Sequence, residues 1–272
     1  STRPSPRRLP LSENFWRPDG QGRMTTLERL LQVRQRRGAG YLTLLDPDRL
    51  SLDELSKRAE LCAEAGADAI LVGTSLMLSA SRNAALFDHL HQIVDIPVIS
   101  FPGDAGQVVP NADAILFLSM VSGRNPELLI GQQVRAAPVL KEYGVEAIAT
   151  AYMLIESGTL TSTEFMSTTR PIPRAKPDIA MAHALAAQYI GMRLVYLETG
   201  SGAAQSVDTK MVEAVAEYVN IPVIVGGGIR DAETAREKVE AGAAFIVTGT
   251  AVEDDPGRLR EISDAVHLGD RS

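Results

Sequence analysis

The sequence is poor in cysteine, in positive charge and in long apolar runs, and each shortage argues against a class of protein. The one cysteine, Cys62, can form neither an intramolecular disulfide nor a multi-cysteine metal site. The formal net charge of -7 argues against the basic face that nucleic-acid binding needs. No apolar run reaches the roughly 18 residues needed to span a bilayer, and the N-terminus lacks the apolar core of a secretory signal. We therefore predict a cytoplasmic protein that binds no nucleic acid.

Histidine is also scarce, and its positions do not suggest chemistry. The four histidines have no zinc-binding spacing, and two of them, His89 and His91, are two residues apart and so do not share a helix face. We interpret His89, His91, His183 and His267 as surface or packing residues. No Ser-His-Asp arrangement is indicated.

From residue 41 onward, short apolar segments alternate with segments that have helical spacing. The predicted strands are 41–45, 68–73, 97–101, 112–118, 145–150, 193–198, 222–226 and 244–249. Strands that are apolar at nearly every position belong to a sheet covered on both faces. Eight such units in one chain favour a (β/α)8 TIM barrel of class α/β. The alternative is an open doubly wound sheet, which usually has a glycine-rich turn after its first strand, where this sequence reads "LDPDR".

Helical spacing predicts helices over 51–66, 81–94, 125–142, 178–191, 207–219, 231–241 and 256–266. After the third strand the chain reads "PGDAGQVVPN", and its prolines and glycines predict that a loop replaces the third helix. The segment 151–177 is too long for a simple connection and is interpreted as a lid, or else as a disordered or oligomer-contact loop. We predict that residues 1–22 form an irregular arm and that residues 23–272 form a single TIM-barrel catalytic domain.

Glycine-rich turns follow the seventh and eighth predicted strands. In a barrel, the loops after these two strands often form a phosphate site. Gly227, Gly228, Gly249 and Thr250 would then lie side by side, and bare backbone N–H groups can approach a phosphate closely. The alternative is a pair of tight turns that bind no ligand.

The sixth strand leads into "YLETGSG", which contains an acid at the end of an apolar strand. Such an acid is costly to bury unless it has a task or a partner. Glu198 could be a general base that takes a proton from a substrate hydroxyl, or a structural ion-pair partner. Tyr196 could hold substrate or fill a layer of the barrel.

The first strand ends in "LLDPDR" and the second in "VGTS". Carboxylate oxygens at a strand end suit Mg²⁺, which completes its shell with water and substrate phosphate. Asp46 is the predicted carboxylate ligand, with Asp48 nearby, and the Ser75 hydroxyl could assist. Asp-Pro sequences also make ordinary turns.

Taken together, "LLDPD", "DAILVGTS", "LFLSMVSGRNPELLIGQQ", "LVYLETGSG", "VGGGI" and "TGT" resemble the geranylgeranylglyceryl phosphate synthase family, whose barrels lack the third helix. The resemblance covers about residues 41–255. It implies a prenyltransferase that joins a polyprenyl diphosphate such as geranylgeranyl diphosphate to the 3-hydroxyl of sn-glycerol 1-phosphate and releases diphosphate. This reaction makes the first ether bond of certain phospholipids.

The resemblance also implies roles for individual residues. Asp46 and Ser75 would bind Mg²⁺, and Glu198, with Tyr196, would be catalytic. The implied glycerol phosphate site is Tyr196, Leu197, Glu198, Thr199, Gly200, Ser201, Gly202, Gly227, Gly228, Gly249 and Thr250. The resemblance further implies a homo-oligomer, either a dimer or a hexamer, and allows peripheral membrane contact through the lipid product.

Two other functions stay open from the sequence. A phosphate-handling isomerase or lyase would need a second acid or base facing Glu198. A non-catalytic barrel that binds prenyl phosphates or phospholipids would need the glycines but neither Glu198 nor Asp46.

Overall fold

Eight parallel strands close into a barrel. The computed structural model describes residues 24–48, 50–73, 80–249 and 255–270. Each strand pairs with the next in the chain, and the eighth pairs with the first. The strands are β1 (Gly40–Leu45), β2 (Ala69–Val72), β3 (Val98–Ser100), β4 (Ala114–Ser119), β5 (Glu146–Leu154), β6 (Leu194–Glu198), β7 (Val223–Gly226) and β8 (Phe245–Thr248). The prediction of a parallel α/β barrel is therefore confirmed, and the alternative of an open sheet is wrong.

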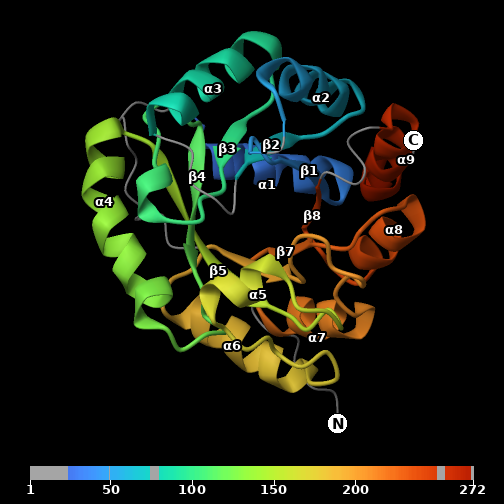
Figure 1. The fold of residues 1–272 in the computed structure, drawn as a ribbon. Helices are drawn as coiled ribbons and strands as arrows, with labels where there is room; N and C mark the ends of the chain where they lie inside the picture. The colour runs from blue at the N-terminus through green and yellow to red at the C-terminus, as the bar shows by residue number, and fades with distance from the viewer. Residues whose placement is uncertain (1–23, 49, 74–79, 250–254, 271–272) are drawn as a thin grey trace.

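Helices surround the barrel on its outside and lie over its two ends (Figure 1). They are α1 (Thr26–Arg37), α2 (Leu52–Glu64), α3 (Ala80–Ile93), α4 (Gln132–Tyr143), α5 (Ser162–Ser167), α6 (Pro177–Tyr189), α7 (Thr209–Tyr218), α8 (Ala232–Glu240) and α9 (Pro256–Val266). A π-helical turn, η2 (Glu127–Gly131), precedes α4, and a 3-10 turn, η3 (Leu268–Asp270), follows α9. Within the described ranges, no helix is both long and apolar enough to cross a bilayer.

The strands separate two apolar layers, one inside the barrel and one between the barrel and the helices. In β6, Leu194 and Tyr196 belong to the inner cluster, whereas Val195 and Leu197 belong to the outer one. Because side chains alternate along a strand, the next inward position after Tyr196 is Glu198, the last residue of β6. The barrel thus directs this acid to the interior at the C-terminal ends of the strands.

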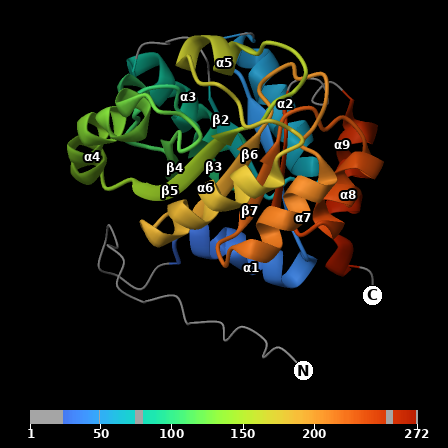
Figure 2. The same ribbon diagram turned by 90° about the horizontal axis from the view of Figure 1, so that it is seen from below.

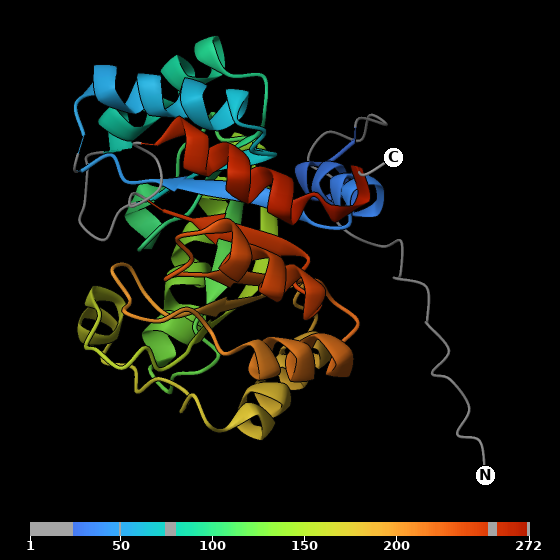
Figure 3. The same cartoon turned by 90° about the vertical axis from the view of Figure 1, so that its right-hand side faces the viewer.

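Helix α1 was not predicted, although its start has a local signal. Thr25 and Glu28 form a capping box, in which each side chain accepts a hydrogen bond from the other residue's backbone N–H. Leu27 and Leu30 pack into the inner apolar cluster, and Glu146 at the start of β5 accepts hydrogen bonds from the Thr26 and Leu27 N–H groups. Helix α1 therefore covers the N-terminal end of the barrel, opposite α5 (Figures 2 and 3).

Between β3 and β4 the chain runs through residues 101–113, which contain the 3-10 turn η1 (Ala105–Gln107). The Asp104 carboxylate accepts a hydrogen bond from the Gly106 N–H at 2.6 Å and begins this turn. The Gln132 side chain of α4 accepts one from the Ala105 N–H at 2.7 Å. This connection is therefore tied to the start of α4.

The segment 151–177 contains more regular structure than the sequence predicts. Strand β5 continues to Leu154, and Ile155 then forms an isolated bridge with Ile172. Helix α5 follows, with Thr161 as its N-cap. The prediction of a strand ending at residue 150 was wrong because the barrel neighbour extends it: β5 pairs with β6 as far as Leu154 opposite Glu198.

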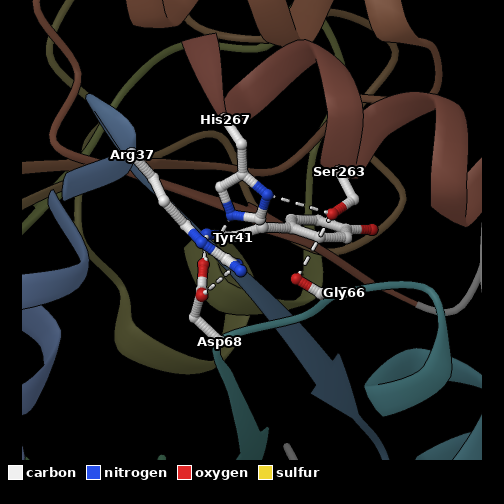
Figure 4. A network of polar contacts seen from close by, with 6 residues as sticks. All are labelled: Arg37, Tyr41, Gly66, Asp68, Ser263 and His267. Atoms are coloured by element: carbon white, nitrogen blue, oxygen red, sulfur yellow. Dashed lines mark hydrogen bonds and ion pairs between the residues drawn. The ribbon is translucent and has the colours of Figure 1, made fainter. Parts of the chain in front are cut away.

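A buried polar network joins α1, β1, the start of β2 and α9 (Figure 4). The Asp68 carboxylate accepts hydrogen bonds from the Tyr41 N–H at 2.8 Å and from an Arg37 guanidinium at 3.0 Å, and it contacts His267 Nε2 at 2.8 Å. His267 Nδ1 lies 3.3 Å from the Ser263 hydroxyl. The Ser263 hydroxyl is buried and donates to the Gly66 carbonyl. This Ser-His-Asp set is therefore structural, and its serine does not act as a nucleophile. His267 is accordingly a packing residue, as predicted, but one with an ionic partner that the sequence did not reveal.

Replacing Asp68 with alanine should lower the free energy of unfolding by about 3 kcal/mol, because it removes a buried carboxylate that accepts from the Tyr41 N–H and the Arg37 guanidinium and contacts His267 Nε2. Chemical denaturation of the variant and the wild type would measure the change. Asp113→Ala is a matched control, since Asp113 also accepts from a strand N–H (Val98) and contacts a histidine (His91) but is 41% exposed. We expect a loss of about 1 kcal/mol there. Equal losses at both positions would contradict the role given to burial.

Candidate active site

A cavity of about 620 Å³ opens at the C-terminal ends of the strands. Most of the residues predicted from the sequence line it together. They are Asp46, Tyr196, Glu198, Gly200, Ser201, Gly202, Gly227, Gly228 and Gly249. Strand β6 and the loops that follow β1, β6, β7 and β8 supply these residues, so segments up to about two hundred residues apart in sequence meet at one end of the barrel.

Four other predicted residues stand apart from this group. Leu197 belongs to the apolar layer under the helices. Thr199 is buried, and its hydroxyl donates to the Gly226 carbonyl at 3.4 Å. Neither residue is among those that line the cavity. Ser75 and Thr250 lie outside the described residues.

Gly227 and Gly228 adopt left-handed backbone conformations, with φ of 78° and 69°. Residues that have a side chain rarely adopt this backbone conformation. Space is also absent: a Cβ on Gly227 would lie 2.5 Å from Glu198 Oε1, and a Cβ on Gly228 would lie 2.7 Å from the backbone of Gln205 and Ser206. The two glycines therefore let the loop after β7 pack directly against the loop after β6.

Gly249 is different, because its φ lies outside the left-handed range and a Cβ there would meet none of the described atoms within 4 Å. It lines the same cavity as Gly227 and Gly228. A side chain at position 249 would therefore project into the cavity, whereas one at position 227 or 228 would collide with the neighbouring loop. Bare backbone of this kind can approach an anion closely.

Glu198 is 5% exposed and occupies the last position of β6. Its Oε1 accepts a hydrogen bond from the Gly200 N–H at 2.6 Å. Burial raises the pKa of this carboxyl, and the Gly200 N–H and the neighbouring Tyr196 hydroxyl offset part of the rise. A buried carboxylate that lines a cavity and has a raised pKa has the properties of a general base.

Three aromatic rings line the cavity beneath Glu198. The Tyr196 ring stacks on Phe101 with ring centroids 5.6 Å apart, and its edge contact with Tyr152 has a separation of 5.5 Å. The Tyr196 hydroxyl has no partner in hydrogen-bond geometry among the described residues. Burial raises the pKa of this hydroxyl, and the charge of the neighbouring Glu198 adds to the rise. A buried hydroxyl of this kind is suited to pair with a polar group of a bound ligand.

Asp46 also lines the cavity, just after β1, the strand that pairs with β8. Its Oδ1 accepts a hydrogen bond from the Asp48 N–H at 3.1 Å. In the described parts of the chain, no three His, Cys, Asp or Glu side chains gather closely enough to hold a metal ion by themselves. A single carboxylate at a cavity wall still suits Mg²⁺, which commonly takes one or two carboxylates and completes its shell with water and substrate phosphates.

A missing third helix implied an apolar groove along the barrel, but the sequence did not predict which residues form the apolar wall of the cavity. This wall consists of Val108 after η1, Ile115, Phe117 and Leu118 of β4, and Ala136 of α4. These residues come from a loop, a strand and a helix, so no local pattern unites them. The only signal was the proline- and glycine-rich segment after β3, which leaves room beside β4.

Arg230 was also missed. It lines the cavity after Gly228, and its guanidinium donates to the Ala203 carbonyl at 2.9 Å. The bond joins the loop after β7 to the loop after β6, which carries Gly200 and Gly202. Arg230 follows the three glycines in the sequence, and this position was the available signal.

Comparisons with known proteins agree with this geometry. A model of the PcrB family matches residues 31–266. The geranylgeranylglyceryl phosphate synthase of Chitinophaga pinensis is 44% identical over 227 residues, which are 84% of this chain and 90% of that protein. The corresponding synthase of Thermococcus gammatolerans is 44% identical over 227 residues, or 84% and 89% of the two chains.

A solved structure is similar over nearly the whole barrel. It is (S)-3-O-geranylgeranylglyceryl phosphate synthase from Thermoplasma acidophilum in complex with its substrate sn-glycerol-1-phosphate. The TM-score is 0.85 at 36% sequence identity, and the match covers 90% of this chain and 99% of the other. The chain therefore belongs to the PcrB family, together with geranylgeranylglyceryl phosphate synthases.

Proposed function

We propose that the protein is a Mg²⁺-dependent prenyltransferase that joins geranylgeranyl diphosphate, or a similar polyprenyl diphosphate, to the 3-hydroxyl of sn-glycerol 1-phosphate. The main support for this proposal is that a single cavity has a polar end and an apolar end. One end has bare glycine backbone beside the buried Glu198, and the other has an apolar wall. Family membership and the glycerol phosphate complex of the Thermoplasma acidophilum enzyme support the same reaction.

The glycine end of the cavity is the proposed phosphate site. The backbone of Gly227, Gly228 and Gly249 would accept the phosphate of glycerol phosphate, with Ser201 and Gly202 on the facing loop. Thr250 stays part of this proposal, as do Leu197 and Thr199, which can contribute only through their backbone or by positioning Glu198 and Gly200. Fixing the phosphate orients the glycerol hydroxyls, and orientation supplies a large part of such catalysis.

Glu198 is the proposed base. The 3-hydroxyl oxygen of glycerol phosphate forms a bond to C1 of the prenyl chain, the bond from C1 to the diphosphate oxygen breaks, and the hydroxyl proton passes to the Glu198 carboxylate. Tyr196 would donate its unpartnered hydroxyl to a substrate oxygen. The apolar wall excludes water from the reacting carbon and receives the prenyl tail.

Asp46 is the residue proposed to hold Mg²⁺, together with Ser75. When bound, the ion neutralises the charge that develops on the departing diphosphate. Asp46→Asn should raise the Mg²⁺ concentration for half-maximal rate at least about tenfold, since even outer-shell partners of a metal are worth that much. A Mg²⁺ titration of the initial rate measures this. An unchanged titration curve would remove Asp46 from the metal site.

Several wider features belong to the same proposal. The segment 101–113, with η1 as its helical turn, would stand in place of the third helix and open the side of the barrel for the prenyl tail. Residues 23–272 would form a single catalytic domain that assembles as a dimer or hexamer. The predicted arm, 1–22, lies outside the described residues, and the cytoplasmic location stays a prediction.

A product assay tests the proposal. The protein is incubated with Mg²⁺, sn-glycerol 1-phosphate and labelled geranylgeranyl diphosphate, and the lipid extract is analysed for the prenylated glycerol phosphate. sn-Glycerol 3-phosphate is the stereochemical control and should give little product. Failure with every prenyl chain length tried would overturn the proposal and favour a non-catalytic prenyl-phosphate-binding barrel.

A further inference from the structure

Two arginines from other parts of the chain hold the loop that joins β6 to α7. We call this loop, residues 199–208, the β6–α7 loop. The Arg230 guanidinium donates to the Ala203 carbonyl at 2.9 Å. The Arg174 guanidinium donates to the Ser206 carbonyl, three residues farther along the loop. Because the loop carries part of the proposed phosphate site, contacts that fix its backbone also fix one wall of that site.

Arg174 reaches the loop from outside the cavity. It is not among the described residues that line the cavity, whereas Arg230 is. Arg174 lies in the chain between α5 and α6, two residues after Ile172, which bridges to Ile155 just beyond β5. The Ile172 N–H donates to the Leu154 carbonyl at 2.8 Å. The segment that carries Arg174 is therefore attached to the barrel.

The second contact of Arg174 is with the start of α7. Another nitrogen of its guanidinium lies 3.7 Å from the Asp208 carboxylate, which caps α7 by accepting from the Lys210 N–H at 3.0 Å. The next residue, Thr209, accepts a hydrogen bond from the buried Lys238 ammonium of α8 at 2.6 Å. The guanidinium thus connects a helix end that is tied to α8 with a carbonyl of the loop.

The part of the loop that Arg174 holds also packs against the glycine turn after β7. A Cβ on Gly228 would lie 2.7 Å from the Gln205 carbonyl carbon and 2.7 Å from the Ser206 nitrogen. Gly228 belongs to the proposed phosphate site. The same short stretch of backbone is therefore in contact with that site and with Arg174, so a shift of this stretch would change the shape of the site.

The beginning of the loop is held separately. Thr161, the N-cap of α5, packs on Gly200, where a Cβ would lie 2.6 Å from its side chain. The Gly200 N–H donates to Glu198 Oε1 at 2.6 Å. Loss of the Arg174 side chain should therefore loosen the far half of the loop and leave the proposed base in place.

We propose that Arg174 is a positioning residue that holds the β6–α7 loop in the shape that binds the phosphate of sn-glycerol 1-phosphate. The inference rests on the proposed function, and it adds the chain between α5 and α6 to the parts of the protein that form the site. A guanidinium suits this role, because its planar fork of N–H groups can donate to a carbonyl and to a carboxylate at once. A lysine would keep the charge but lose the fork.

Calorimetric titration with sn-glycerol 1-phosphate tests the inference without turnover. Arg174→Gln should weaken binding about tenfold, because the displaced loop is no longer aligned with the phosphate. Arg174→Lys should recover only part of the affinity. Arg170→Gln is the matched control, since it removes an exposed cation from the same segment, and it should bind like the wild type. In steady-state kinetics, Arg174→Gln should raise the KM for sn-glycerol 1-phosphate and leave kcat within about twofold, because the phosphate is not the reacting group.

Amide hydrogen exchange gives a measurement that needs no ligand. Exchange within residues 199–208 should be faster in Arg174→Gln than in the wild type, and exchange in the strands should be unchanged. Faster exchange throughout the barrel would indicate a general loss of structure and would overturn the inference.

The binding results separate the inference from the proposed function. Wild-type affinity in Arg174→Gln would overturn the inference alone. An equal loss in Arg170→Gln, or full recovery in Arg174→Lys, would mean that charge and not position matters, and would also overturn it. If the wild type binds sn-glycerol 1-phosphate and the variants behave as expected but no product forms, the proposed reaction is wrong and the inference stands. Absence of wild-type binding would overturn both.

Discussion

Replacing Glu198 with glutamine is expected to lower kcat about a thousandfold while leaving the fold intact. Glutamine has the same shape and keeps an oxygen that can accept from the Gly200 N–H, but it cannot take the proton of the glycerol hydroxyl. Single-turnover rates with saturating substrates would measure the effect on the chemical step. Glu156→Gln is the control, because Glu156 is an exposed carboxylate at the same end of the barrel that also accepts from a backbone N–H, that of Arg174.

The same variant should be more stable than the wild type at neutral pH. Burial raises the pKa of Glu198 in the folded state above its unfolded value, so the folded protein disfavours the charged form. At a pH below the pKa of the unfolded state, the carboxyl is protonated in both states, and its burial does not lower stability through ionisation. As pH rises, the unfolded chain loses its proton first, and stability falls until the pH has passed the folded pKa. The stabilisation by glutamine should therefore be present at pH 7 and absent in acid.

The raised pKa also sets the acid limb of the pH profile. Because the base must be deprotonated, kcat/KM should fall on the acid side with an apparent pKa above the ordinary glutamate value of about 4.3. Turnover by Glu198→Gln equal to that of the wild type, or an acid limb that persists unchanged in the variant, would place the base elsewhere.

Gly227→Ala is expected to have the second largest effect, through both strain and collision. The alanine would have to adopt a φ near 78°, and its Cβ would lie 2.5 Å from Glu198 Oε1. We expect a loss of about 1–3 kcal/mol of stability from the backbone and a loss of about a hundredfold in kcat/KM from displacement of the base. Thermal unfolding and steady-state kinetics on the same preparation measure the two effects.

Gly249→Ala is the informative partner of this variant. A Cβ at position 249 has room among the described atoms and an ordinary φ, so stability should be unchanged. The methyl group would nevertheless enter the proposed phosphate cradle and raise the KM for sn-glycerol 1-phosphate about tenfold. Unaltered KM in Gly249→Ala would mean that the phosphate does not lie against this backbone, whatever Gly227→Ala does.

The features that sequence patterns predicted are those that depend on local composition. Each strand of the barrel is an apolar run bounded by turn residues, and Glu198 stands out because a charged residue ends such a run. Gly227 and Gly249 could be placed together because barrel topology brings the ends of β7 and β8 side by side. Local signals and one topological rule were sufficient for this side of the cavity.

The features that were missed depend on contacts between distant segments. Strand β5 continues to Leu154 because it pairs with β6 as far as Glu198. Nothing in the sequence around residue 150 indicates that the strand continues beyond it. The partner of His267 is Asp68, which lies nearly two hundred residues earlier in the chain. The apolar wall of the cavity likewise brings together Val108 from a loop and Ala136 from α4. Helix α1 is the exception, since the Thr25 and Glu28 of its capping box are a local signal in the sequence.

Thr161, the N-cap of α5, packs directly against Gly200 in the loop after β6, and this contact limits which residues can be changed in a redesign. Gly200 has a φ of 93°, which residues with a side chain rarely adopt, and a Cβ there would lie 2.6 Å from Thr161, so glycine must be kept at this position. The outward positions Leu160 and Phe165 have no such constraint, because they contact solvent. Libraries that keep the threonine and glycine fixed and randomise these outward positions could therefore change the outer surface of α5 without altering the proposed site beneath it.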